Sequence, residues 1–454
     1  MRKKLLEVDM VNGSIFKSIV AFVVPLILGN ILQLLYNAAD VIVVSRYAGS
    51  EAMASVGATG SLTSLIVSLF IGLSVGTSVV VSKSYGARSS LGVHRAVHTS
   101  MLLSFVAGVA AMVVGLAFSR YLLTLMGTPE GKVLDGAVLY MKIYFIAAPA
   151  TLVYNFGASI LRAIGDTKRP LYILTFSGIV NVVLNLVFVI AFRMEVAGVA
   201  VATAVSSYIS AFAVLFVLLR ADRIYKLSLK HLRFYKDELS EIIKVGLPAG
   251  IQSSVFSISN VLIQSAVNSF GTIVIAGNSA AANIEGFVYT AMNAFYQAAI
   301  TAVSQNYGAK KEKRVYRSYH VSLLSVAVVG FALGLFTAVF ARGLLGIYIT
   351  DSREAIDAGV IRVVYTGLPY FLCGMMEVQA GLLRGLGYST ITMVNSLIGA
   401  CGFRVFWVLC ILPLNHCLEM LFLCWPISWI VVMIMHTAVY LFVKKKAMRK
   451  MYMA

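Results

Sequence analysis

Three acidic side chains inside long apolar runs are the residues of this sequence best placed to do chemistry. Asp40, Glu285 and Glu377 lie well within such runs, whereas most of the 19 acidic residues lie in tails or loops. A charge near the centre of a bilayer costs at least about 2.5 kcal/mol, so it usually faces a partner or a water-filled cavity. A carboxylate in that setting can bind a proton or hold a cation. The alternative interpretation is that each acid only anchors a contact between helices.

Asp40 belongs to a polar stripe on its predicted helix. Polar side chains recur there at spacings of three, four and three residues, which places them on one helical face: Asn30, Gln33, Asn37 and Asp40. Tyr36 borders this stripe. Pro25 lies upstream and removes a backbone donor, so the helix can bend near it. A titratable acid on such a helix indicates a switch driven by protonation, although an ordinary packed kink is the other interpretation of Pro25.

Amides and a tyrosine complete the candidate sites in both halves of the chain. Asn181 and Asn185 lie one helical turn apart, and Asn155 lies in the preceding apolar run. These amides can line a polar pocket with Asp40, although amides also join membrane helices as purely structural contacts. In the second half, the polar companions of the two acids are Asn260, Tyr289 and Asn293.

The composition requires lipid as the solvent for most of the chain. Hydrophobic residues make up 59% and charged residues 12%, whereas soluble domains carry roughly 25% charged residues. A span needs about 20 apolar residues, and such runs are predicted at 17–44, 54–82, 97–119, 137–161, 170–192, 196–219, 242–268, 278–303, 318–341, 358–383, 390–412 and 419–442. The predicted fold class is an all-α integral membrane protein of about twelve transmembrane helices.

Basic residues gather in alternate loops between these runs. The formal net charge is +18, but Lys and Arg lie in short segments between spans, so nucleic-acid binding is excluded. The basic segments include Arg2, Lys3 and Lys4 at the N-terminus and the region around Lys444 near the C-terminus. By the positive-inside rule, we expect a multi-pass protein of the cell membrane with both termini in the cytoplasm.

The two halves of the chain are copies of one scaffold. Ser82–Ala87 recurs as Ser304–Ala309, and Ala158–Gly165 recurs as Ala380–Gly387, each at an offset of 222 residues. The polar linker at 220–244 divides the chain into an N-terminal lobe, 1–225, and a C-terminal lobe, 226–454. Each half holds an even number of spans. We therefore expect two six-helix bundles related by a pseudo-twofold axis along the membrane normal, with a cavity between them.

Signatures of enzymes and of bound metals are missing from the sequence. No Walker A loop, HExxH or GxSxG motif occurs, so neither catalysis nor direct ATP drive is expected. The five Cys form no CxxC pair and no Cys/His cluster at metal-ligand spacing. We expect no metal and no cofactor, and the class that remains is a transporter.

The sequence resembles the multidrug and toxic compound extrusion (MATE) family of transporters over nearly its whole length. The resemblance is carried by residues 25–49 with Asn37 and Asp40, by the paired Tyr-Gly-Ala endings at Tyr85 and Tyr307, and by the segments LRAIGDTKRP and LRGLGYST. It implies antiport, in which a cation enters down its gradient while an organic, often cationic and amphipathic, compound leaves. The expected partners are small organic substrates and the lipid bilayer, and the expected state is a monomer.

The resemblance also implies roles for individual residues. Asp40 matches the first-span acid that is proposed to be protonated in the proton-coupled branch of the family, and the positions around that pocket match Pro25, Gln33, Tyr36, Asn155 and Asn181. Asn185 stands where that branch often has a second acid, and the seventh span lacks the acid of many sodium-coupled members. The expected ion-coupling site therefore comprises Asp40, Asn155, Asn181 and Asn185. Proton coupling is the hypothesis, and sodium coupling is the alternative.

A lipid-linked saccharide flippase of the wider superfamily is the second alternative. That function favours a cationic central cavity, whereas the buried charges predicted from the sequence are mainly acidic, with Arg404 as the exception. The expected substrate site therefore contains acids that attract a cation, and it comprises Gln33, Tyr36, Asn37, Asn260, Glu285, Tyr289, Asn293 and Glu377.

Overall fold

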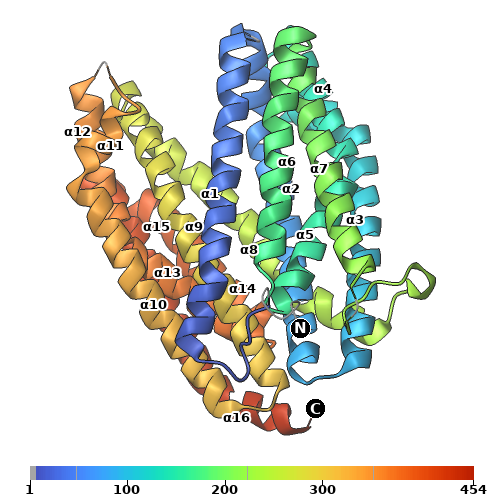
Figure 1. Ribbon diagram of the computed structural model, residues 1–454. Helices are drawn as coiled ribbons and strands as arrows, with labels where there is room; N and C mark the ends of the chain where they lie inside the picture. Colours follow the sequence, from blue (N-terminus) through green and yellow to red (C-terminus); the bar gives the residue numbers. More distant parts are fainter. Residues whose placement is uncertain (1–6, 48, 222, 351, 454) are drawn as a thin grey trace. The chain divides into compact units, whose positions relative to one another are not determined.

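The computed structural model describes residues 7–47, 49–221, 223–350 and 352–453, and these residues are mostly helical (Figure 1). No strand occurs among them. Long apolar runs form helices in lipid because every backbone N–H and C=O group must find its partner within the segment. The basic residues Arg2, Lys3 and Lys4, which belong to the predicted cytoplasmic N-terminus, lie outside the described residues.

The chain divides into two compact units. Unit 1 contains Leu28–Gly246 with the described residues before Asp9, and unit 2 contains Asp9–Ile27 and Leu247–Ala454. This boundary differs from the predicted division at 225 and 226 because the linker packs on unit 1. There the Ser228 backbone donates a hydrogen bond to His98 at 2.9 Å, and Ile242 is buried in the unit 1 core. The helix α1 (Ile15–Tyr47) passes from unit 2 into unit 1 after Ile27.

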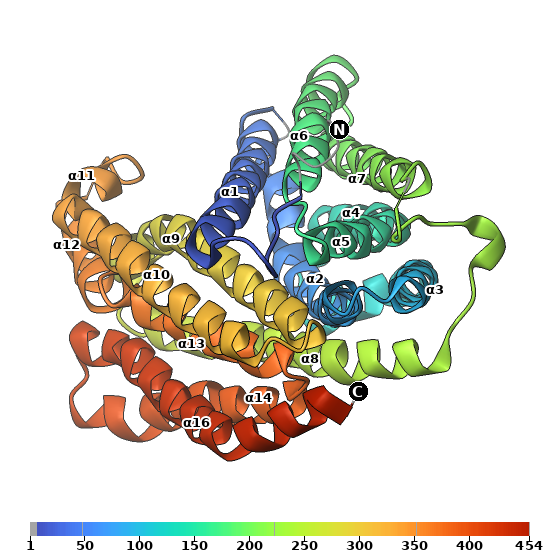
Figure 2. The same ribbon diagram turned by 60° about the horizontal axis from the view of Figure 1, so that its bottom comes forward.

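In unit 1, α5 is the central helix. It packs against α2, α3 and α7 (Figure 2), and its residues Phe156 and Ile160 are fully buried. The chain bends by 46° between α4 and α5, where Pro149 in the first turn of α5 needs no helical hydrogen bond. The helices after α1 are α2 (Gly49–Gly86), α3 (Ser90–Leu125), α4 (Lys132–Ile146), α5 (Ala148–Ala163), α6 (Lys168–Leu186) with the π-turn η2 (Val187–Ala191), and α7 (Glu195–Leu219).

In unit 2, α13 takes the corresponding central place. It packs against α9, α10 and α16, and Pro369 precedes it at the position that corresponds to the bend before α5. The helices are α8 (Lys236–Asn268), which begins in unit 1, α9 (Thr272–Gly308), α10 (Glu312–Val339), α11 (Ala341–Gly346), α12 (Arg353–Arg362), η4 (Val363–Gly367), α13 (Tyr370–Gly385), α14 (Ser389–Ser396), η5 (Leu397–Gly402), α15 (Phe403–Phe406), η6 (Trp407–Ile411), η7 (Leu412–Leu414) and α16 (Leu418–Met453).

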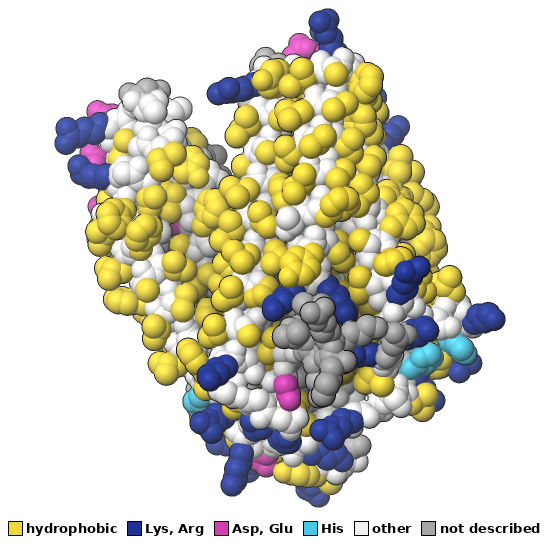
Figure 3. All heavy atoms as spheres, in the orientation of Figure 1, with side chains coloured by type: hydrophobic (Ala, Val, Ile, Leu, Met, Phe, Trp, Pro, Cys, Tyr) yellow, Lys and Arg dark blue, Asp and Glu magenta, His cyan; other side chains and the backbone are white. Residues whose placement is uncertain are grey.

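The lengths and surfaces of these helices fit a bilayer. Ten helical segments of the described chain are long and apolar enough to span a membrane, and α4 with α5 passes the same test as one bent span. The remaining long helix, α9, has 37 residues and carries the polar residues Asn278, Glu285 and Asn293. Figure 3 shows hydrophobic side chains along the helices, with Lys and Arg mainly near helix ends. The predicted fold class is confirmed.

The sequence repeat also appears in the backbone. Arg88 and Lys310 are 222 residues apart, and both adopt a left-handed φ, at 55° and 56°, after the helices that end in Tyr-Gly. Gly165 and Gly387 have the same separation, with φ of 92° and 94°. A residue with left-handed φ ends a helix because the N–H groups that follow it can turn back and donate hydrogen bonds to the last carbonyls of the helix. Both lobes therefore end the same helices in the same way.

Candidate functional site

The candidate ion site lies within unit 1, where α1 meets α6. The Nδ2 group of Asn185 donates a hydrogen bond to the Asp40 carboxylate. Asn185 is completely buried, and its Nδ2 also lies 3.4 Å from the Oδ1 atom of Asn181. Tyr140 of α4 lies within electrostatic range of Asp40. The structure thus brings together three of the four residues predicted for ion coupling.

A second set of contacts joins this site to α7. The Nδ2 group of Asn181 lies 3.5 Å from Thr203 Oγ1 and 3.4 Å from Ser206 Oγ. Sequence reasoning did not select Thr203 or Ser206, because single hydroxyls in an apolar helix are common. The Oδ1 atom of Asn185 is buried and has no hydrogen-bond donor among the described residues. A carbonyl oxygen in that position can accept a hydrogen bond from a protonated group or ligate a cation.

Tyr36 holds the C-terminal half of α1 against α6. Its hydroxyl donates to the Thr175 carbonyl at 3.2 Å, and a Cβ atom added to Gly178 would lie 1.8 Å from the Tyr36 ring. Only glycine leaves room for the ring at that position. Because Asp40 follows Tyr36 by about one helical turn, this contact also fixes the height at which the carboxylate meets Asn185.

Several residues predicted for this site do not contact Asp40 in the described structure. Asn155 of α5 donates to the Thr151 carbonyl of its own helix at 2.9 Å. Gln33 and Asn37 have exposed side chains, as suits residues predicted to contact a substrate. Pro25 lies inside the continuous helix α1, two residues before the unit boundary that follows Ile27. Its role as a hinge stays a prediction.

In unit 2, the carboxylate of Glu285 is already paired. Arg362 of α12 donates to its two oxygens at 2.7 and 3.0 Å, and also to the Asn278 side chain. Both charged side chains are largely buried. Glu285, expected as an open acid for a cationic substrate, is therefore neutralised by a partner that sequence reasoning missed.

Glu377 of α13 lies in a second polar cluster. It is within electrostatic range of Tyr289, Tyr296 and Arg384. Arg384 is buried and donates to Tyr296 and, at 2.8 Å, to Gln252. Glu377 thus has aromatic neighbours and one cation nearby, which makes it the more open of the two acids.

The remaining residues predicted for the substrate site are only partly connected to this cluster. Asn293 accepts a hydrogen bond from Gln297 at 3.2 Å and lies beside Tyr289. The side chain of Asn260 on α8 is exposed, and the structure gives it no described contact with Glu377.

The balance of buried charge in unit 2 corrects the sequence-based expectation. Three arginines, Arg362, Arg384 and Arg404, are buried there, whereas Glu285 is the buried acid among its described residues and Glu377 is half-buried. The interior of unit 2 is thus not mainly acidic, and Arg404 is not an isolated exception. The sequence-based count left out Arg362, which stands near the start of its predicted span, and Arg384, which stands one residue beyond the end of that span.

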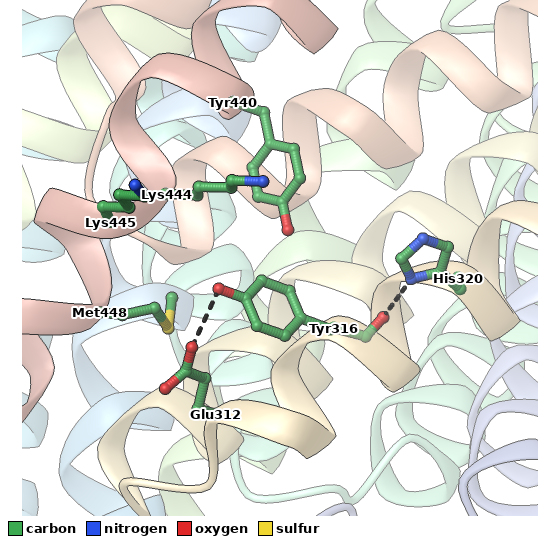
Figure 4. Close-up of a pocket in the computed structure, with 7 residues that line it drawn as sticks. All are labelled: Glu312, Tyr316, His320, Tyr440, Lys444, Lys445 and Met448. Carbon is green, nitrogen blue, oxygen red and sulfur yellow. Dashed lines mark hydrogen bonds between the residues drawn. The ribbon is translucent and has the colours of Figure 1, made fainter.

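A surface groove lies at one end of unit 2, between α10 and α16 (Figure 4). Its volume is about 660 Å³, and within it the Tyr316 hydroxyl donates to Glu312 at 3.2 Å. Lys444 and Lys445 bring positive charge to the same groove. It includes none of the residues predicted for the site, and its mixed charges select no single sign of ligand.

Comparison with known proteins gives a consistent family. The MatE family model matches residues 25–187 and 248–408. The probable multidrug resistance protein YoeA of Bacillus subtilis is 28% identical over 400 residues, which is 86% of each chain. The multidrug export protein MepA of Staphylococcus saprophyticus is 21% identical over 379 residues, which is 83% of each chain.

Solved structures agree on the fold. The crystal structure of MATE in complex with MaL6 superposes with a TM-score of 0.88 over 99% of both chains, at 22% identity. The family model covers well over half of the chain, with one matched segment in each of the two repeats. The chain therefore belongs to the MATE family of efflux transporters.

Proposed function

We propose that the protein exports organic, cationic and amphipathic compounds in exchange for protons, and that Asp40 carries the exchanged proton. The observation behind this proposal is the contact of Asp40 with Asn185, where no basic side chain of the described residues pairs with the carboxylate. Family membership supports efflux, and the names of the relatives, multidrug resistance and multidrug export proteins, support a broad range of organic substrates.

The Asn185 amide suits both charge states of Asp40. The ionised carboxylate accepts from Nδ2, and a protonated carboxyl group can donate instead to Oδ1, the buried acceptor that has no described donor. Protonation therefore exchanges the donor and the acceptor between α1 and α6. Because Pro25 lies in the same helix, repacking of the Asp40 face bends α1 near the proline and releases the substrate.

The acid proposed to attract a cationic substrate is Glu377. Tyr289 and Tyr296 lie close to it, and aromatic faces stabilise an organic cation by about 0.5–2 kcal/mol each. Tyr289 is 41% exposed, so part of its ring is open to a ligand. Glu285 is the weaker candidate for binding a cation, because Arg362 already neutralises its charge.

Transport by purified protein in proteoliposomes tests the proposal. Asp40→Asn is expected to abolish efflux driven by a pH gradient, while the protein keeps its melting temperature. Asp135→Asn is the matched control, because Asp135 is an exposed acid in a surface ion pair with Arg120. Full gradient-driven efflux in the Asp40→Asn variant would refute proton coupling through this residue.

Sodium coupling is the rival that one observation favours. Asn185 contacts both the Asp40 carboxylate and the Asn181 oxygen through its Nδ2 group, so the two amide oxygens belong to the same polar cluster as the carboxylate, and hard cations prefer such oxygen ligands. Efflux driven by a sodium gradient, with no pH difference across the membrane, would select this version. Efflux that needs the pH gradient and ignores sodium would select the proton.

A further inference from the structure

Arg404 occupies an unusual place inside unit 2. It lies in α15, between the π-turns η5 and η6 of one membrane span, and its side chain is 3% exposed. Its Nε group donates to Ser428 at 3.2 Å, and its guanidinium carbon lies 3.9 Å from the centre of the Trp425 ring. Single π-turns within α-helices occur frequently at functional sites.

The other two buried arginines of unit 2 have acids close by, and Arg404 does not. Arg362 is paired with Glu285, and Arg384 has Glu377 within electrostatic range. Among the described residues, no carboxylate forms an ion pair with Arg404, and its polar neighbours are Tyr370, Cys373, Cys401 and Cys424. Its four terminal N–H groups therefore have no acceptor in the described part of the chain.

A second donor without an acceptor lies beside this guanidinium. The Nε1 group of Trp425 is buried and has no hydrogen-bond partner among the described residues. Cation–π contact with the Trp425 ring compensates only part of the cost of burying an unpaired cation, which amounts to several kcal/mol. Two kinds of donor at one place, without a protein acceptor for either, indicate that the acceptor comes from outside the protein.

The repeat places this site where unit 1 has its own polar contact. In unit 1, Asn181 of the fifth span contacts Thr203 and Ser206 of the sixth. At the offset of 222 residues, Thr203 corresponds to Trp425 and Ser206 to Ser428, the two residues that Arg404 contacts from the fifth span of its own half. The same junction of spans thus carries an amide in one unit and a guanidinium in the other.

We propose that Arg404 and Trp425 form an anion-binding subsite in unit 2, which takes the carboxylate, sulfonate or phosphate group of an amphipathic compound. A guanidinium binds such groups through two parallel N–H···O bonds, and the aromatic ring packs against the apolar part of the ligand. This inference rests on the proposed export of organic compounds. It widens the substrates from simple cations to zwitterions and organic anions.

Equilibrium binding to the full-length protein in nanodiscs tests the subsite. The probes are a rhodamine dye with a free carboxylate and the methyl ester of the same dye, which lacks the negative charge. Arg404→Gln is expected to weaken binding of the acid about tenfold or more, as for one lost charge-assisted contact, and to leave the ester within about twofold. No gradient is present, so failure of proton coupling cannot mimic this result.

Three further variants keep the test decisive if Arg404→Gln folds poorly. Arg404→Lys is expected to retain part of the preference for the acid, and Trp425→Phe is expected to weaken the acid selectively, because it removes the N–H donor but keeps a ring. Arg342→Gln is the control, since Arg342 lies in an exposed ion pair with Asp357. Equal weakening of acid and ester in the Arg404 and Trp425 variants would overturn the proposal, and so would no change in either.

The lipid composition of the nanodiscs distinguishes two sources of the anion. If the phosphate of an anionic lipid occupies the subsite, phosphatidylglycerol will compete with the acid dye in the wild-type protein and not in Arg404→Gln. If a soluble organic anion is the ligand, binding of the dye will not depend on phosphatidylglycerol. Both results support the subsite, and the first would also support the flippase alternative.

Discussion

Removing the charge of Glu285 gives a strong test of how unit 2 is held together. Arg362 makes two charge-assisted hydrogen bonds to this carboxylate, at 2.7 and 3.0 Å, and both side chains are largely buried. Breaking a buried pair by removing one partner costs about 3–5 kcal/mol, because the other charge is left without compensation. For a unit of this size, each kcal/mol lowers the melting temperature by roughly 2–4 °C. Glu285→Gln should therefore melt about 10 °C below the wild type.

The assay is thermal unfolding of the detergent-purified protein, followed by tryptophan fluorescence and by the loss of monodisperse protein. The double variant Glu285→Gln/Arg362→Gln removes both charges and is expected to recover at least half of the lost stability. Asp135→Asn is the control, because its ion pair with Arg120 has similar length, 3.1 Å, but side chains 64% and 65% exposed; we expect a loss of about 1 kcal/mol or less. An unchanged melting temperature for Glu285→Gln would refute the reasoning. So would a double variant whose loss of stability equals the sum of the losses measured for Glu285→Gln and Arg362→Gln alone.

Two further predictions concern α1 and the segment before it. The first is Gly178→Val in α6, whose added Cβ would lie 1.8 Å from the Tyr36 ring of α1. Because overpacking costs about 1–3 kcal/mol, this variant should melt several degrees below the wild type. A wild-type melting temperature would contradict the prediction. Partial burial acts to raise the pKa of Asp9, but hydrogen bonds from Asn12 and Val11 outweigh it and hold the pKa below the usual 3.8. The ionised form is thus favoured by folding, so Asp9→Asn should be less stable than the wild type at neutral pH. The difference should shrink as the pH falls below 3.8, and a difference independent of pH would count against the assignment.

The scaffold and the centre of the unit 1 site were predictable because both are written in local sequence patterns, namely short repeated motifs and the spacing of polar residues along one helix. The repeat follows from exact offsets, and helical spacing places Asn181 and Asn185 on one face. An acid in an apolar helix must find a polar partner, and the amides of the fourth and fifth spans were the candidates in the same lobe. The structure accordingly places Asp40 against Asn185, although 145 residues separate them.

The partners of the unit 2 charges were not predictable in this way. Glu285 and Arg362 lie 77 residues apart, and Arg362 stands near the start of its predicted span, where a basic residue ordinarily reaches the membrane interface. Its burial depends on the packing of α12 against α9, which no local spacing reveals. The unit boundary was missed for the same reason, since the polar linker looks solvent-exposed until its contacts with His98 and with the unit 1 core are known.

Asp40 of unit 1 and Arg404 of unit 2 have no ion-pair partner among the described residues, and their charges are of opposite sign. Unit 1 holds Asp40 among amides and hydroxyls, and unit 2 holds Arg404 among thiols and aromatic rings. A carboxyl group can exchange its proton during a transport cycle, whereas a guanidinium stays charged in proteins. Only unit 1 can therefore sense the pH gradient through its lone charge, while Arg404 offers a constant positive charge to a ligand. If both proposals hold, the driving ion and the selectivity for anionic groups are set in different copies of one repeat, and each can change by mutation without the other.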